Sequence, residues 1–324
     1  MLNKRAIITG ISGQDGAYLA QLLLKKGYTI LGLLRDFKTS SLEGLEYLKI
    51  KNDIQFLECD LEDREAVEKI VKNFNPTEIY NLAAQSSVYL SFKNPIETFK
   101  FNTSSVFNLL EAIKNTNLSV RFYQASSSEM YGRVNNLPIS ESSILHPLSP
   151  YAISKSAAHF TCIHYRESYK MHVCSGVLFN HESYLRKSTF FVKKIIQESI
   201  KIKNGLQDYL YVGNIDVYRD FGYAPKYVEA IFLMLQLDEP SDFLICSGQS
   251  VSLRELIYYL FEKLNISIDK CKISEDLYRP ADIENMYGNN AKAKKLLNWD
   301  YDLSPFQMID LLLEEELSNY TNSK

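Results

Sequence analysis

Short hydrophobic runs alternate with longer amphipathic stretches through the first half of the chain. Runs rich in β-branched and aromatic residues predict buried strands, and apolar residues that recur every three or four positions predict helices. The expected strands are 5–9, 29–34, 54–58, 78–82, 120–125, 173–179 and 243–247, and the expected helices are 18–26, 62–74, 95–114 and 151–169.

The order of these elements predicts an α/β fold. Strands that alternate with helices of this length form a parallel, doubly wound sheet, because each crossover helix returns the chain to the same end of the sheet. We therefore expect a Rossmann domain over residues 1–180, with a return segment near 215–248. The pattern loosens afterwards, which predicts a smaller, discontinuous substrate lobe, mainly over 181–324. With 324 residues, 46% of them hydrophobic, the chain can bury a core of this size.

A glycine-rich turn stands between the first expected strand and the first expected helix. Its glycines would let the backbone turn tightly and approach a pyrophosphate at the helix N-terminus. An ordinary turn can carry the same spacing, but the position directly after the first strand favours a dinucleotide site. The spacing resembles that of the extended short-chain dehydrogenase/reductases. The residues assigned to the cofactor here are Gly10, Gly13, Gln14, Asp15 and Gly16.

The end of the second expected strand bears on the choice of cofactor. No acidic residue stands at the usual ribose-binding position, and Arg35 just beyond it can pair with a 2′-phosphate. Asp36 would repel that phosphate unless it points away. NADP is therefore the expected cofactor, with NAD as the alternative. The superfamily resemblance places adenine and ribose contacts at Asp60, Leu61, Leu82 and Ala84.

Tyr151 and Lys155 lie one helical turn apart on the same face of an expected helix. The ammonium is expected to stabilise the tyrosinate and depress the pKa of the phenol, which would supply a base near neutral pH. Ser127, at the end of the preceding strand, can hydrogen-bond a reacting sugar hydroxyl. Such Tyr-Lys pairs arise by chance on many helices, but this one follows the fifth strand of a dinucleotide fold, which favours catalysis.

Glu129 is the residue that discriminates between reaction types. Dehydrogenases and epimerases need only the serine, tyrosine and lysine, whereas elimination of water across carbons 5 and 6 of a sugar needs a further acid/base. The alternative interpretation is a helix-capping or loop carboxylate with no chemical role.

Several motifs make the chain similar to the GDP-mannose 4,6-dehydratases over nearly its whole length. They are the segments 8–16, 126–132, 178–183, 213–216, 219–222, 278–280, 291–294 and 297–299. The resemblance implies oxidation at carbon 4 by Tyr151 with Lys155 and Ser127, elimination of water by Glu129, and return of hydride to carbon 6. It also implies a homodimer or homotetramer.

The resemblance assigns binding roles as well. It places His181 and Arg186 near the cofactor. Arginines that hold the nucleotide would suit bidentate phosphate contacts, although each could also be an ordinary surface ion pair. The positions for nucleotide and sugar are Ser86, Glu129, Asn180, Lys194, Gly213, Arg219 and Arg279.

Some positions depart from most relatives: Ser87 replaces a histidine, Arg35 and Asp36 replace two arginines, and Tyr184 and Leu185 replace Pro-Arg. They leave the hexose open. GDP-mannose is the family default, and GDP-N-acetylglucosamine or a GDP-heptose is the alternative. A carbon 4 dehydrogenase or epimerase and a non-catalytic NAD(P)-binding sensor are rival interpretations, and the retained catalytic set argues against the sensor.

Charge and composition exclude other classes of protein. A net charge of −3 and a pI of about 6.0, with no basic cluster, give no basis for nucleic-acid binding. No apolar run reaches the roughly 18 residues of a membrane span, so we expect a cytoplasmic protein with no membrane partner. Scattered histidines and cysteines predict no metal site and reduced, mostly buried thiols. The acidic run 314–316, in a terminal amphipathic helix, is expected to be a solvated face.

Overall fold

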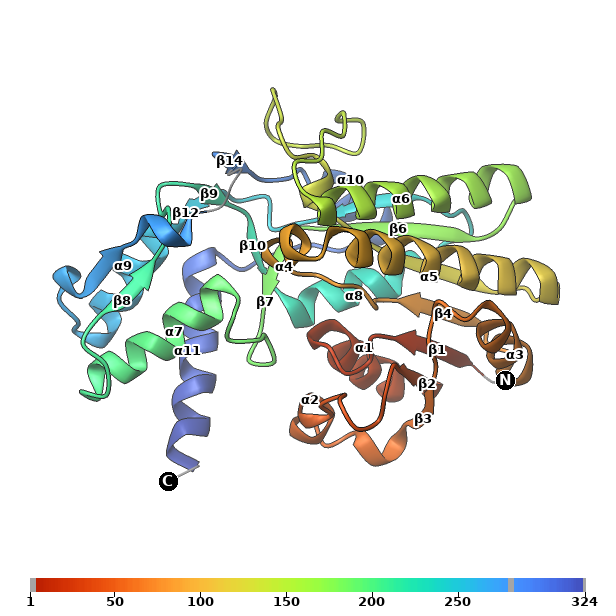
Figure 1. The fold of residues 1–324 in the computed structure, drawn as a ribbon, viewed down its shortest axis with the longest axis horizontal. Coiled ribbons are helices and arrows are strands. Elements are labelled where there is room, and N and C mark those ends of the chain that lie inside the picture. The colour runs from red at the N-terminus through yellow and green to blue at the C-terminus, as the bar shows by residue number, and fades with distance from the viewer. Residues whose placement is uncertain (1–3, 279–282, 323–324) are drawn as a thin grey trace.

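The computed structural model describes residues 4–278 and 283–322, and for residues 320–322 it describes the backbone only. In this part of the chain, seven parallel strands form one central sheet (Figure 1). The chain winds outwards from β1 in both directions, which confirms the expected doubly wound fold. In order across the sheet the strands are β11 (Asp242–Ile245), β6 (Val173–Leu178), β5 (Arg121–Ser127), β4 (Glu78–Asn81), β1 (Arg5–Thr9), β2 (Thr29–Leu34) and β3 (Gln55–Glu58).

Helices cover both faces of this sheet (Figure 1). Ile7 and Ile8 of β1 are each 0% exposed and belong to opposite core layers, because successive strand residues point to opposite faces. A strand buried on both faces is hydrophobic throughout, which explains the continuous apolar runs of the sequence. The Ile8 layer contains α1 (Gln14–Lys25) and α8 (Ala224–Met234), and the Ile7 layer contains α3 (Arg64–Phe74), α5 (Pro95–Thr116) and α6 (Pro150–Tyr169).

Helix α1 begins at Gln14, four residues before the expected start at residue 18. The sequence pattern hides this first turn because its polar residues are drawn inward: Gln14 is 9% exposed and bonds a later segment. The other helix starts follow local signals. Pro95 and Pro150 stand at the first helical positions of α5 and α6, where a missing N–H costs nothing.

The second half of the chain builds smaller elements beside the sheet (Figure 1). Three helices share one apolar cluster: α7 (Phe191–Lys203), α9 (Leu253–Leu264) and α11 (Pro305–Asn322). Among the short strands, β10 (Phe221–Tyr223) pairs with β7 (Asn180–Glu182), and β13 (Cys271–Ile273) pairs with β8 (Leu210–Val212). A further strand, β9 (Tyr218–Arg219), lies between β12 (Val251–Ser252) and β14 (Asn285–Met286). The remaining helices are α2 (Glu43–Tyr47), α4 (Val88–Lys93), α10 (Ala291–Leu297) and 3-10 turns at 51–53, 128–130, 268–270 and 275–277.

The acidic run on α11 corrects one expectation. Glu314 is exposed, but Glu316 is 9% exposed and forms an ion pair with Lys193 of α7, itself 7% exposed. Glu315 accepts a hydrogen bond of 2.6 Å from the hydroxyl of Tyr47 on α2. The run is therefore an interface between α11 and two other helices, and only its first member belongs to a solvated face.

The five cysteines are free thiols, and all except the half-buried Cys271 are buried, as the sequence predicts. Over the ranges 4–278 and 283–322, no helix combines the length and apolarity that crossing a membrane would require. The same ranges contain no group of three or more side chains placed to hold a metal ion.

Candidate active site

The turn between β1 and α1 brings Gly10 against the segment that follows β4. Gly10 has φ +68°, and a Cβ on it would lie 2.8 Å from the amide nitrogen of Ala83. A Cβ on Gly16 would lie 2.4 Å from the carbonyl oxygen of Gly10. A side chain at Gly10 would collide with the segment after β4, and one at Gly16 would force the helix away from the turn. No side chain caps α1 at Gly13, so the N-terminus of this helix is suited to a phosphate.

Thr9 braces the same edge of the sheet. Its hydroxyl donates to Oδ1 of Asn81 at 2.6 Å. The hydroxyl oxygen also accepts from the backbone N–H groups of Leu82 at 3.2 Å and Ala83 at 3.1 Å. Asn81 in turn donates to Oε1 of Gln124 at 2.8 Å. These bonds tie the ends of β1 and β4 to each other and to the middle of β5, and so fix the backbone beside the glycine turn. The sequence analysis missed this brace, although a hydroxyl directly before the first glycine was its signal.

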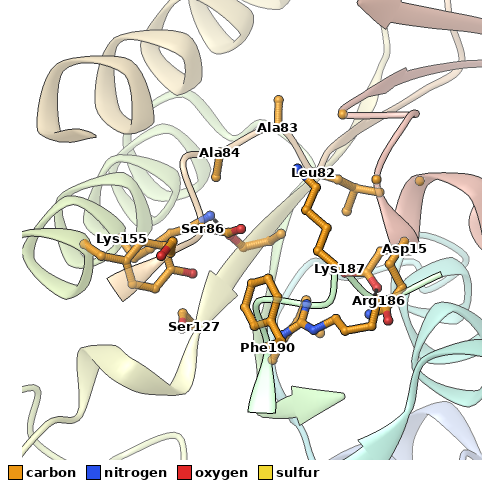
Figure 2. A pocket seen from close by; sticks show the side chains of 18 of the residues that line it. Asp15, Leu82, Ala83, Ala84, Ser86, Ser127, Lys155, Arg186, Lys187 and Phe190 are labelled. Atoms are coloured by element: carbon orange, nitrogen blue, oxygen red, sulfur yellow. Dashed lines mark hydrogen bonds between the residues drawn. The ribbon is translucent and has the colours of Figure 1, made fainter. Parts of the chain in front are cut away.

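A cavity of about 520 Å³ opens where these strands end (Figure 2). The carboxyl edge is where doubly wound sheets bind ligands. Most of the residues that the sequence assigned to cofactor, substrate or chemistry line this cavity. They are Gly10, Gly13, Gln14, Asp15, Gly16, Arg35, Leu61, Leu82, Ala84, Ser86, Ser127, Glu129, Tyr151, Lys155, Asn180, His181 and Arg186.

Other assigned residues lie elsewhere. Asp60 does not line the cavity, and its carboxylate accepts a hydrogen bond of 3.0 Å from the backbone N–H of Glu62. Lys194 lines neither this cavity nor the smaller one beside it, because its ammonium donates to the carbonyl oxygen of Tyr211 at 2.6 Å. Arg279 lies outside the described residues.

The smaller cavity has a volume of about 180 Å³ and is lined by Gly213 and Arg219, among others. Glu129, Asn180, Arg186, Phe190 and Phe191 line both cavities. These five residues therefore form a wall common to the two. A molecule that spans both cavities would pass this wall.

Tyr151 lies 8% exposed at the start of α6. Burial raises the pKa of Tyr151 to about 12, the hydrogen bond with Ser127 opposes this rise, and the charge of Glu129 adds to it. The expectation that Lys155 depresses the pKa of the phenol is therefore wrong. The ammonium of Lys155 donates to the carbonyl oxygen of Ala125 at 2.9 Å and lies 5.8 Å from the tyrosine ring centre.

Lys155 itself occupies a desolvated position and is 4% exposed. Burial lowers the pKa of Lys155 to about 8, because the charged form loses its hydration. A group with a pKa this close to neutrality can take up or release a proton during turnover. Burial, more than mutual attraction, thus sets the proton affinities of the Tyr151 and Lys155 pair.

Glu129 stands in the short 3-10 turn after β5. Ser127, rather than Glu129, caps this turn: the backbone N–H of Glu129 donates to the Ser127 hydroxyl at 3.3 Å. The interpretation of Glu129 as a capping carboxylate is therefore not supported. Its half-buried side chain lines both cavities, a position from which a carboxylate can reach a sugar lying between them.

Asp15 and His181 form an ion pair within the cavity lining. Nε2 of His181 lies 2.9 Å from both carboxylate oxygens of Asp15. Burial opposes both charges, yet Asp15 raises the pKa of His181 and His181 lowers the pKa of Asp15. Gln14 donates to the carbonyl oxygen of His181 at 3.1 Å and accepts from the hydroxyl of Ser183 at 2.7 Å. The start of α1 is thereby fastened to β7 and the residues after it.

Arg35 lines the cavity beyond β2, with its guanidinium carbon 4.5 Å from the ring centre of Phe101. Asp36 turns back on its own chain, where Oδ1 accepts a hydrogen bond of 2.7 Å from the backbone N–H of Lys38. Asp36 is not part of the cavity lining. The guanidinium therefore borders the cavity without the neighbouring carboxylate.

Comparison with known proteins identifies the family. Residues 7–312 match the sequence profile described as GDP-mannose 4,6 dehydratase. The chain is 38% identical to GDP-mannose 4,6 dehydratase from Dictyostelium discoideum, over 98% of this chain and 97% of that protein. The chain belongs to this family. Another GDP-mannose 4,6 dehydratase, number 2 from Caenorhabditis elegans, is 37% identical over 97% of this chain and 89% of its own length.

Several solved structures share the fold. RMD from Pseudomonas aeruginosa, complexed with NADPH, has a TM-score of 0.80 at 27% identity and covers 98% of this chain and 100% of its own. DesIV from Streptomyces venezuelae, a dTDP-glucose 4,6-dehydratase with NAD and TYD bound, has a TM-score of 0.87 at 19% identity, with 98% of each chain covered. A UDP-glucose 4-epimerase from Thermotoga maritima reaches 0.87 at 23%, over 98% of this chain and 99% of its own. These comparisons confirm the extended short-chain dehydrogenase/reductase fold.

Proposed function

We propose that the chain is a GDP-sugar 4,6-dehydratase, a hydro-lyase that works with a nicotinamide dinucleotide. The observation that carries the proposal is the position of Glu129, which lines both cavities and follows directly on the strand that ends with Ser127. Tyr151 and Lys155 line the larger cavity beside it. Membership of the GDP-mannose 4,6-dehydratase family supports this assignment over a dehydrogenase or epimerase that stops at carbon 4.

The larger cavity fits a dinucleotide. The glycine turn leaves no room for a Cβ at Gly10 or Gly16, and the uncapped N-terminus of α1 suits a pyrophosphate. When bound, the cofactor would accept hydride from carbon 4 of the sugar and return it to carbon 6. We assign its contacts to the lining residues predicted from the sequence, from Arg35 and Leu61 at one end to Tyr151 at the other.

The side chains of the protein would carry out the proton transfers. Tyr151 would act as the ionised phenol, hydrogen-bonded to Ser127, and its raised pKa means that this ionisation comes before the reaction. The phenolate then takes the proton of the carbon 4 hydroxyl as that carbon becomes a ketone. The ketone acidifies the proton on carbon 5, which Glu129 removes and passes to the departing carbon 6 hydroxyl. The proton held on Tyr151 then returns to carbon 5 as hydride returns to carbon 6. The net change in the sugar is the loss of one water.

The two parts of the chain would divide the ligands between them. Residues 1–180, with the return segment near 215–248, would bind the dinucleotide, and residues 181–324 would hold most of the GDP-sugar. Support comes from the linings, because the larger cavity draws mainly on the first part, and the smaller cavity includes Glu182, Gly213 and Leu277 of the second.

Incubation with a panel of GDP- and UDP-linked hexoses and heptoses, followed by mass spectrometry, tests this function. GDP-mannose is the first substrate of the panel, and GDP-N-acetylglucosamine and GDP-heptoses are the alternatives. A product lighter by one water, without net cofactor reduction, supports the proposal. A product of unchanged mass would identify an epimerase instead.

The variant Glu129→Gln tests the role of the carboxylate. We expect dehydration to fall about 10³-fold, the range for loss of a general acid/base, while binding of the GDP-sugar stays nearly unchanged. Glu167→Gln, at an exposed position on α6, serves as the matched control. Unchanged turnover in Glu129→Gln would remove the basis for assigning a dehydratase.

We further propose NADP over NAD, because Arg35 borders the cavity and Asp36 turns away from it. Arg35→Met should weaken NADPH binding about tenfold, the worth of one charge-assisted contact, and leave NADH binding nearly unchanged. Fluorescence titration of both reduced cofactors measures this ratio. A wild-type protein that binds NADH as tightly as NADPH would overturn the preference.

Apolar side chains stand exposed along α5 and α6, which pack against each other (Figure 1). Their spacing puts those of each helix on one face, and an exposed apolar face of this kind marks an interface. We propose a homodimer or homotetramer built on this face, and light scattering would measure its mass. We also propose a cytoplasmic location, which the free cysteines support. The exposed residues are Ile96, Phe99, Phe107, Ile153 and Phe160.

A further inference from the structure

The segment between β7 and α7 lines the larger cavity and carries two adjacent cations, Arg186 and Lys187. Figure 2 shows the side chain of Lys187 extending from this segment across the cavity towards Leu82. The backbone of Leu82 is the one that packs against the glycine turn, 2.9 Å from the position of a Cβ on Gly10. The ammonium of Lys187 therefore points to the place where the turn would receive a pyrophosphate.

The two cations differ in their engagement with the protein. Nε of Arg186 lies 3.4 Å from Oε2 of the buried Glu182, and its guanidinium carbon lies 3.6 Å from the ring centre of Phe190. Lys187 is exposed, and within the described part of the chain nothing forms a hydrogen bond, ion pair or ring contact with its ammonium. Arg186 is held in place, whereas Lys187 can move to meet a ligand.

We propose that Lys187 binds the pyrophosphate of the dinucleotide from the side opposite the glycine turn. The inference rests on the proposed function, since it takes NAD or NADP as the ligand. The pyrophosphate carries two negative charges, whereas a helix N-terminus supplies only about half a positive charge. Asp15 in the first turn of α1 adds no attraction, and its charge is already matched by His181. A cation from another segment would add to this half charge, and Lys187 is placed to supply it.

The position of Lys187 also distinguishes its proposed ligand, the pyrophosphate, from the 2′-phosphate that is assigned to Arg35. Arg35 stands beyond the end of β2, whereas Lys187 reaches towards Leu82, the residue after β4 (Figure 2). A contact with the pyrophosphate is shared by both cofactors, but a contact with the 2′-phosphate exists only for NADP. Loss of the Lys187 ammonium should therefore weaken NADPH and NADH binding by the same factor, and loss of the Arg35 guanidinium should weaken NADPH binding alone.

Fluorescence titration of NADPH and NADH against wild type, Lys187→Met, Lys187→Arg and Arg35→Met tests this inference without any GDP-sugar. We expect Lys187→Met to weaken both cofactors about tenfold, with a smaller effect at high salt, because screening weakens exposed charge pairs. Lys187→Arg should restore most of the affinity. Lys295→Met, which removes an exposed lysine away from the cavity, is the matched control and should change nothing.

Unchanged affinity in Lys187→Met, or a loss confined to NADPH, would overturn the pyrophosphate contact. Circular dichroism of each variant shows whether the fold is kept. The proposed function fails separately: if cofactors bind and respond to Lys187→Met but no sugar is dehydrated, the contact stands and the dehydratase assignment falls. If dehydration proceeds and Lys187→Met binds cofactor normally, only the contact falls. A wild-type protein that binds neither cofactor would overturn both.

Discussion

The larger and the smaller cavity are built by different means. The walls of the larger cavity are the ends of neighbouring strands in one sheet, and its shape depends on backbone features such as the glycine turn and the Thr9 brace. The smaller cavity is assembled from residues on short, separate elements, including Arg219 of β9 and Phe221 of β10. The fold thus determines where a dinucleotide can bind, whereas individual side chains determine which ligand can bind next to it. Single substitutions should therefore change the reaction rate, the stability of the fold or the choice of ligand separately.

The sharpest test of this separation is Tyr151→Phe. Removal of the hydroxyl should lower the rate of dehydration by about 10³- to 10⁴-fold, because no other group there takes the carbon 4 proton. Affinity for the GDP-sugar, measured by calorimetry, should stay nearly the same. Tyr169→Phe, the same substitution at an exposed site of α6, is the control. A comparable loss of GDP-sugar affinity would show that chemistry and substrate binding are not separable at Tyr151.

An ion pair between two helices of the second half of the chain offers the next test. Glu316→Gln leaves Lys193 as a buried charge without its ion-pair partner, which should lower the free energy of unfolding by about 3 kcal/mol. Denaturant titration measures this difference. Glu314→Gln, at an exposed position on the same helix, should change it little. If the double variant Lys193→Met with Glu316→Leu is as unstable as Glu316→Gln, the buried charge is not the cause.

A smaller effect of opposite sign is expected at Lys155. Its pKa in the folded protein is about 8, against about 10.4 unfolded, so the unfolded chain binds more protons between these values. Stability therefore rises with pH across that interval, and the charged lysine costs stability below it. Lys155→Met should raise the free energy of unfolding at neutral pH by about 2 kcal/mol, after loss of its hydrogen bond. The difference from wild type should shrink towards pH 10, and a constant difference would contradict the buried charge.

The sequence predicted the larger cavity well for a physical reason. Strand order follows from the alternation of elements, and the carboxyl edge of a parallel sheet brings the ends of its strands together. Residues placed just after strands, such as Gly10, Leu82 and Ser127, therefore appear together in the cavity. Asp60, also just after a strand, does not, because its carboxylate bonds the backbone of Glu62.

Other features depend on contacts between segments that are distant in sequence. The burial of Glu316 requires Lys193 on another helix, and no pattern within α11 indicates that pairing. The pKa of Tyr151 reflects burial by the whole fold and the path of Lys155 to Ala125, which the Tyr-Lys spacing alone cannot show. Lys187 was missed as well, because the route of its segment into the cavity is a tertiary feature.

Because Glu129, Asn180, Arg186, Phe190 and Phe191 line both cavities, we expect binding in one cavity to affect binding in the other. A ligand in one cavity that orders these side chains lowers the entropic cost for a second ligand to bind in the other cavity. Thermodynamic reciprocity then requires the same gain in both directions. The reaction begins and ends with the same dinucleotide. A GDP-sugar that slows its escape would let one cofactor molecule serve many turnovers, so the purified protein should retain its cofactor most firmly when substrate is present.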